Sequence, residues 1–144
     1  MKALTIRQPW LWAILYAGKD IENRTTNWKY RGQILLHAAK GMTLEEYRFG
    51  MRYIDRALTI NGVVAPDVPD YRDLEKGAIL GVATIVDCVT DSDSVWFMGE
   101  YGYVLENVQI LDPIPCKGNL GLWNVPLDVY DEVKAQYRRK YIND

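Results

Sequence analysis

Near its start the chain reads Leu4-Thr5-Ile6-Arg7-Gln8-Pro9-Trp10 and, after a short apolar run, Gly18-Lys19-Asp20-Ile21-Glu22-Asn23-Arg24. Pro9 can open a helix, because the N–H that proline lacks has no partner in a first helical turn. Ala17 and Gly18 can close that helix, since glycine readily adopts the left-handed cap conformation. We therefore predict a helix of about two turns between the two stretches.

The four residues after this turn, Ile21 to Arg24, are predicted to be extended. Alternate side chains of a strand point to the same face, so Glu22 and Arg24 share one face while Ile21 and Asn23 take the other. Lys19 sits at the preceding bend, near the charged face, and as a turn residue it is expected to bury little apolar area. These charged groups are candidates for one site.

The second stretch resembles the signature of the ASCH domain family, a branch of the PUA-like superfamily with the pattern Gly-x-Lys-x-x-Glu-x-Arg. Lys19, Glu22 and Arg24 match this pattern, whereas Ala17 takes the glycine position and Gly18 follows one place late. Further segments recur in the same order in longer family members: Arg7-Gln8-Pro9-Trp10, Ile34-Leu35-Leu36-His37-Ala38, Gly77-Ala78-Ile79-Leu80-Gly81-Val82 and Pro113-Ile114-Pro115. The resemblance covers roughly residues 3–125 and implies a PUA-like β-barrel.

The composition fits a single domain over residues 1–144. A hydrophobic content of 49% with 25% charged residues is ordinary for a soluble globular protein, and the length suffices for a sizeable core. No apolar run approaches the roughly 20 residues of a membrane-spanning helix. Lys2 and Arg7 interrupt the apolar run that a signal peptide needs. We therefore expect a cytoplasmic protein with no membrane partner, and its oligomeric state stays open.

The charge distribution and the number of metal-ligating residues limit the kinds of ligand that we expect. The net charge is −2, yet residues 1–40 carry seven basic and two acidic residues, so this part is +5 and the rest −7. A local anion site fits this distribution better than a broad nucleic-acid groove. Two cysteines, Cys88 and Cys116, and one histidine, His37, are too few for an ordinary zinc site, and no carboxylates cluster at a metal-binding spacing. We expect no metal and no cofactor.

Periodicity predicts the remaining elements. Thr43-Leu44-Glu45-Glu46 has the form of a capping box, and apolar residues then recur at helical spacing, so residues 44–60 are predicted to form an amphipathic helix that ends at Asn61-Gly62. We also predict strands over 31–38, 77–89, 101–106 and 119–125, a surface loop over 63–76, a loop or short helix over 92–99, and a helix over 127–141. Residues 108–111 either continue the 101–106 strand or pair with it.

The strands are interleaved with few helices, and the apolar runs are short and rich in glycine, which argues against a parallel βαβ architecture. We predict an α+β fold, a small mixed and mainly antiparallel β-barrel with helices packed outside. The PUA-like resemblance, rather than periodicity, selects a barrel over an open sheet.

The candidate site residues each have a structural alternative. If the protein is an enzyme, Lys19 and Glu22 are the catalytic candidates, with Glu100 as a further candidate that can equally be a solvated loop tip. The binding candidates are Arg7, Gln8, Trp10, Arg24, Trp28, His37 and Tyr103. Gln8 can instead cap the first helix, the charged triplet can be a surface ion-pair cluster, and a histidine in an apolar strand is by default structural. Trp10 and Trp28 are candidates because an indole beside basic residues can stack on a base.

Two functions from different classes follow. The first is a module that binds single-stranded RNA or a modified nucleoside in a basic pocket, as the resemblance implies. The second is a metal-independent hydrolase in the same pocket, because some small ASCH proteins resemble amidohydrolases that deacylate 4-acetylcytidine with a lysine, a threonine and a glutamate, and others have been proposed as ribonucleases. Lys19 matches that lysine, but Glu22 stands at the threonine position. A regulatory interaction domain with an unused pocket is a third interpretation.

Overall fold

The computed structural model describes residues 1–64 and 66–142. Its strands are β1 (Lys2–Ile6), β2 (Ile21–Arg24), β3 (Gly32–Ala38), β4 (Ala78–Val89), β5 (Tyr101–Pro115) and β6 (Leu122–Asn124). Its helices are α1 (Trp10–Tyr16), α2 (Leu44–Ile60) and α3 (Leu127–Tyr137), and a π-helical turn, Arg138–Ile142, follows α3. None of the described helices is long and apolar enough to cross a membrane.

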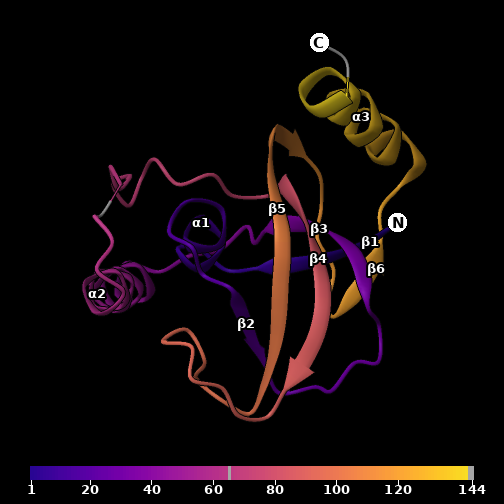
Figure 1. Cartoon of the computed structure of the whole chain (residues 1–144). Coiled ribbons are helices and arrows are strands. Elements are labelled where there is room, and N and C mark those ends of the chain that lie inside the picture. The colour runs from indigo at the N-terminus through magenta and orange to yellow at the C-terminus, as the bar shows by residue number, and fades with distance from the viewer. Residues whose placement is uncertain (65, 143–144) are drawn as a thin grey trace.

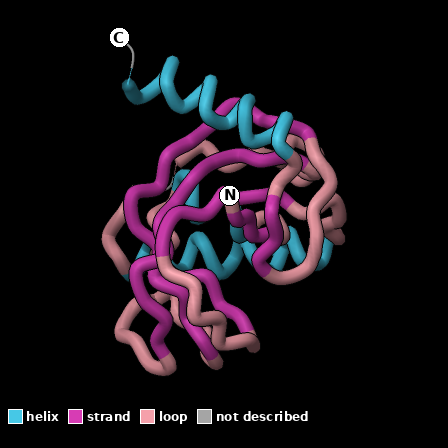
Figure 2. Tube along the Cα trace, turned by 90° about the vertical axis from the view of Figure 1, so that its right-hand side faces the viewer, coloured by secondary structure: helices cyan, strands magenta, loops and turns pink. Residues whose placement is uncertain are grey.

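The six strands form one sheet in the order β2-β5-β4-β3-β1-β6. Neighbouring strands pair antiparallel, except that β1 runs parallel to β3. Register shifts interrupt the β4–β5 ladder, and such bulges bend a strand. The sheet curls accordingly into half a barrel (Figure 2). This confirms the predicted α+β fold with a mixed, mainly antiparallel sheet.

The helices pack outside the sheet. α1 and α2 lie on one side of it, and α3 lies apart from both, above the opposite side (Figure 1). Trp12 of α1, Ile54 and Leu58 of α2 and Trp96 of the β4–β5 loop belong to one buried cluster. Val129 and Val133 attach α3 to a second cluster on β3, β4 and β5. The groove between α1, α2 and β2 is where the charged triplet lies.

Several predicted elements have the expected bounds. α1 spans seven residues and Gly18 has a φ of 75°, so the two-turn helix and its glycine turn are confirmed. α2 covers the predicted residues 44–60, and its capping box is formed: Thr43 Oγ1 accepts from Glu46 N at 3.1 Å, while Thr43 N donates to Glu46 Oε1 at 3.0 Å. β4 is central, between β3 and β5.

Residues 101–115 form one strand, with Asn107 at a φ of 52°, so residues 108–111 continue the 101–106 strand, which was one of the two predicted alternatives. Two other predicted elements differ from those observed. β6 is only three residues long, because it pairs with just Lys2 to Leu4 of β1 and Gly121 turns the chain with a φ of 66°. α3 gives way to the π-helical turn at Arg138. The predicted loop over 63–76 has neither helix nor strand at its described residues, and residue 65 lies outside them.

Candidate functional site

Lys19, Glu22 and Arg24 form one ion cluster at the start of β2. Arg24 Nη2 and Nε lie 2.8 and 2.9 Å from Glu22 Oε2, and Lys19 Nζ lies 3.6 Å from Glu22 Oε1. Arg24 Nη2 also donates to the Thr5 carbonyl of β1 at 2.8 Å. Both oxygens of the Glu22 carboxylate therefore face a cation.

Lys19 is buried, which corrects the expectation that a lysine at this turn covers little surface. It is only 3% exposed, because the Gly18 turn folds it inward and its backbone N–H donates to the Ala13 carbonyl at 3.1 Å. Its ammonium donates to the Ile21 carbonyl and lies 5.9 Å from the centre of the Trp10 ring. Burial lowers the pKa of Lys19, although the charge of Glu22 acts in the opposite direction.

A cavity of about 290 Å³, here called the Lys19 cavity, opens beside this cluster. It is lined by Trp10, Lys19, Glu22, Asn23, Glu46, Phe49 and Met98. Trp10 meets the edge of Phe49 with ring centroids 6.3 Å apart, so one wall is aromatic and another is charged. The volume is near the lower end for small-molecule pockets, which suits a single base or nucleoside.

Four of the residues that line the Lys19 cavity were not predicted. Glu46 and Phe49 come from α2, Asn23 from β2 and Met98 from the β4–β5 loop. Asn23 holds that loop in place, because it donates to the Trp96 carbonyl at 2.9 Å and accepts from Met98 N at 2.8 Å. The only sequence signal at any of them was the capping box at Glu46, and it pointed to a helix start rather than to a cavity.

Arg7 and Gln8 diverge, although they are adjacent in sequence. Arg7 is exposed and donates through Nε and Nη2 to the two carboxylate oxygens of Glu46, each at 2.5 Å. This pairing raises the pKa of Arg7 and lowers that of Glu46 to about 2. Gln8 is 2% exposed, accepts from Trp12 N at 2.8 Å and donates to the Glu75 carbonyl at 3.0 Å. Gln8 thus caps α1 and lies outside the Lys19 cavity.

Trp28, Tyr103 and Glu100 also lie outside the Lys19 cavity. The Arg24 guanidinium lies 5.8 Å from the centre of the Trp28 ring, and this ring packs 5.2 Å from that of Tyr103. Tyr103 is fully buried, and its hydroxyl donates to the Thr26 carbonyl and accepts from Trp28 N, each at 2.5 Å. Glu100 is exposed just before β5. Trp28 and Tyr103 brace the β2–β3 connection.

His37 belongs to a closed hydrogen-bond chain. The Cys116 carbonyl only accepts, so the proton lies on Nε2, which donates to it at 2.8 Å. Nδ1 then accepts from Thr5 Oγ1 at 3.1 Å, and Thr5 Oγ1 in turn accepts from Trp123 Nε1 at 3.1 Å. Burial lowers the pKa of His37. The arrangement is that of a neutral structural histidine with both ring nitrogens occupied.

Comparison with known proteins identifies the family. The sequence profile of the ASCH domain matches residues 4–137, nearly the whole chain. A comparison with curated proteins finds no match. The matched residues include the charged triplet, both helices beside it and the whole sheet except Lys2 and Ala3 of β1. This protein therefore belongs to the ASCH domain family.

Proposed function

We propose that this ASCH domain binds RNA by taking one unstacked base, or a modified nucleoside, into the Lys19 cavity. Membership of the family supports a general role in binding RNA. The finer proposal rests on one observation, the Lys19–Glu22–Arg24 cluster, in which Lys19 and Glu22 are buried, beside an aromatic wall in a cavity of about 290 Å³. Proteins that read RNA commonly stack a splayed base on an aromatic ring and bind its polar edge.

The two walls supply these two contacts. Trp10 and Phe49 offer the aromatic surface, and stacking of one base is worth about 1–3 kcal/mol. A charged lysine has three N–H donors, and the Ile21 carbonyl takes one of those of Lys19, while Glu22 Oε1 lies 3.6 Å from its ammonium. A remaining N–H can donate to a base carbonyl, and Glu22 Oε1 can accept from an exocyclic amine.

A hydrolase in the same cavity is the second candidate, and the lowered pKa of Lys19 is the observation that favours it. Glu22 stands where a threonine hydroxyl acts in the amidohydrolase pattern, so it would activate water instead of attacking the substrate. Arg24 engages Glu22 Oε2 with two N–H groups, which leaves Oε1 alone to take a proton. Because half of the carboxylate is occupied in this way, we rank binding above an amidohydrolase or ribonuclease activity.

One experiment distinguishes the binding function from the hydrolase function. Purified protein is titrated with nucleosides, including N4-acetylcytidine, and with short single-stranded RNAs, while binding is followed by calorimetry and products by chromatography. Glu22→Gln keeps the shape of the side chain and one oxygen that can accept from Arg24, but it removes the carboxylate that would act as the general base. A binding module gives a complex and no product in either protein, whereas an enzyme keeps its ligand in Glu22→Gln and loses turnover. Absence of binding to every probe contradicts the proposal.

A further inference from the structure

A second cavity, of about 880 Å³, is larger than the Lys19 cavity and has Arg7 in its lining. It is here called the basic cleft. Its lining includes Arg7, Lys40, Lys76 and Lys117, and none of its lining residues is an aspartate or glutamate. The cleft is positive in a chain whose net charge is −2. Neither candidate function above makes use of it.

The strand order of the sheet gathers these four cations. Ile6 pairs with Ala38, Ala38 with Ala78 and Ala78 with Pro115, so four adjacent strands, β1, β3, β4 and β5, begin or end at one edge. Each cation stands one or two residues beyond such a strand end. At the usual strand spacing this edge extends over roughly 14 Å, enough for more than one phosphate group.

The lysines of the cleft are available to a ligand. Lys40, Lys76 and Lys117 are exposed, and among the described residues none of the three has a carboxylate within salt-bridge distance. Within the described part of the chain, Lys76 donates to the nearby Leu74 carbonyl at 3.3 Å and lies 6.0 Å from the centre of the Tyr71 ring. Gly41, Gly77 and Gly118 also line the cleft, and residues without side chains let a ligand approach the backbone.

The basic cleft is linked to the Lys19 cavity in two places. Arg7 lines the cleft and Glu46 lines the cavity, and these two side chains are paired at 2.5 Å. Thr5 lines the cleft, and its carbonyl accepts from Arg24 of the ion cluster at 2.8 Å. A strand that places a base beside Lys19 can therefore pass the Arg7–Glu46 pair and continue along the three lysines.

We infer that the basic cleft binds the phosphodiester groups of the single-stranded RNA whose base enters the Lys19 cavity. The inference rests on the proposed function and extends it, because it makes the ligand an RNA strand rather than a free nucleoside. The cations stand in a row along one edge of the sheet, and both their spacing and their positive charge suit a flexible polyanion. Exposed lysines on several loops can neutralise phosphates without reading the base sequence.

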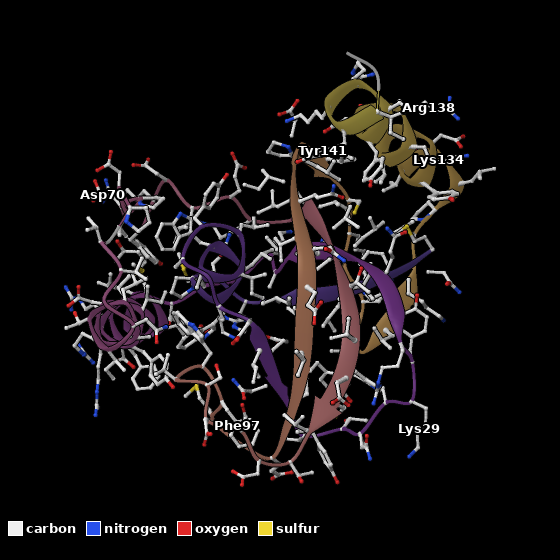
Figure 3. All side chains as sticks on the ribbon, viewed as in Figure 1. Lys29, Asp70, Phe97, Lys134, Arg138 and Tyr141 are labelled. Atoms are coloured by element: carbon white, nitrogen blue, oxygen red, sulfur yellow. The ribbon has the colours of Figure 1, made fainter. Side chains whose placement is uncertain are left out.

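The test uses Lys40→Gln/Lys117→Gln, which removes two exposed charges and leaves the Lys19 cavity unchanged. The matched control is Lys134→Gln/Arg138→Gln, which removes two charges from α3 and its π-helical extension (Figure 3), neither of which lines either cavity. Binding of a short single-stranded RNA, of the nucleoside and of the nucleoside triphosphate is titrated at several salt concentrations.

We expect the cleft variant to bind the RNA roughly 25-fold more weakly at 0.1 M salt, with a salt slope smaller by about 1.4, since each single-strand phosphate contact contributes about 0.7. Its affinity for the nucleoside should be unchanged, and the control should match wild type with all ligands. The inference is overturned if the cleft variant binds the RNA as tightly as wild type does. It is also overturned if the control variant loses as much RNA affinity as the cleft variant, or if the cleft variant loses affinity for the triphosphate alone. If Lys19→Met still weakens RNA binding in the first of these cases, the proposed function survives. If wild type binds neither RNA nor nucleoside, both the inference and the proposed function fail.

Discussion

At the scale of single residues, the account depends most on Lys19. Its burial means that substitution by alanine would leave a void as well as remove a charge, so Lys19→Met is the better variant. Glu22 keeps both bonds from Arg24 in this variant, and the fold should be retained. Binding of nucleoside or RNA should weaken by about 1–3 kcal/mol, the range for a hydrogen bond to a charged group.

The measurement for Lys19→Met is a calorimetric titration combined with thermal unfolding followed by circular dichroism. Lys134→Gln on α3 is the control for loss of one positive charge. Wild-type affinity in Lys19→Met, with wild-type unfolding, would show that this ammonium does not contact the ligand.

A second residue-scale prediction concerns Glu46 and pH. Its pKa is lowered to about 2, chiefly by the hydrogen bonds from Arg7. A lowered carboxyl pKa in the folded state stabilises the protein above the unfolded pKa, and this contribution is lost as the pH falls through the folded value. Arg7→Ala should therefore raise the pKa of Glu46 towards its ordinary value and should lower stability near neutral pH more than near pH 2.

An NMR titration of the Glu46 side-chain carboxyl carbon gives this pKa directly, and urea unfolding at several pH values gives the stability difference. Glu45, which is exposed and next to it, is the internal control. A Glu46 pKa that does not respond to Arg7→Ala would disprove the pairing.

The predicted site residues that lie together in the structure are also close together along the chain. Lys19, Glu22 and Arg24 fall within one turn and one strand, so local geometry was enough to bring them together. Phe49 and Met98 reach the cavity only through packing of α2 and the β4–β5 loop, which periodicity does not describe. The burial of Lys19 was missed because the pattern places a lysine at a turn but does not show that the Gly18 turn folds its side chain inward.

At the scale of elements, α2 carries Glu46 and Phe49 to the cavity, and its first turn depends on Thr43. Thr43→Ala removes the acceptor for Glu46 N and should cost about 1 kcal/mol, or about 4 °C in the unfolding temperature. Thr59→Ala near the other end of α2 is a control, because Thr59 Oγ1 bonds only back to the Asp55 carbonyl of its own helix. Equal unfolding temperatures for Thr43→Ala and wild type would contradict the role of the cap.

The loop between β5 and β6 is held against β1 and β3 through Gly118. A Cβ at this position would lie 2.6 Å from His37 Cε1 and 2.7 Å from Thr5 Oγ1, so Gly118→Ala should destabilise the fold by about 1–3 kcal/mol through overpacking. Gly41→Ala is the matched control, since its Cβ would meet only the Arg7 guanidinium, at 3.6 Å. Urea unfolding compares the two, and equal losses would disprove the tight contact.

Most elements were predictable because they carry local signals: a proline and a glycine at the ends of α1, a capping box on α2, and a long apolar run at β4. Tertiary pairing decides the bounds that the sequence left open or placed wrongly. β5 continues to Pro115 because β4 pairs with it as far as Ala78, and β6 is short because it meets only part of β1.

At the scale of the whole molecule, the order of the strands in the sheet could not be predicted from the sequence pattern. β1 pairs with β3 and β6, and β2 pairs with β5, and no periodicity reports these long-range partners. The basic amino-terminal quarter was visible in the sequence, but the basic cleft draws on Arg7, Lys40, Lys76 and Lys117, which lie far apart along the chain. The order and register of β1, β3, β4 and β5 bring these cations to one edge of the sheet.

The most direct test of the central claim is a titration of wild type and Lys19→Met with a short single-stranded RNA and with duplex DNA of the same length, at several salt concentrations. We predict that wild type binds the single strand more tightly, with a shallow salt slope, because the positive charge is local and the base-sized cavity requires an unstacked base. Lys19→Met should lose this preference. Equal or tighter binding of the duplex with a steep salt slope, or single-strand binding by Lys19→Met equal to that of wild type, would contradict the account.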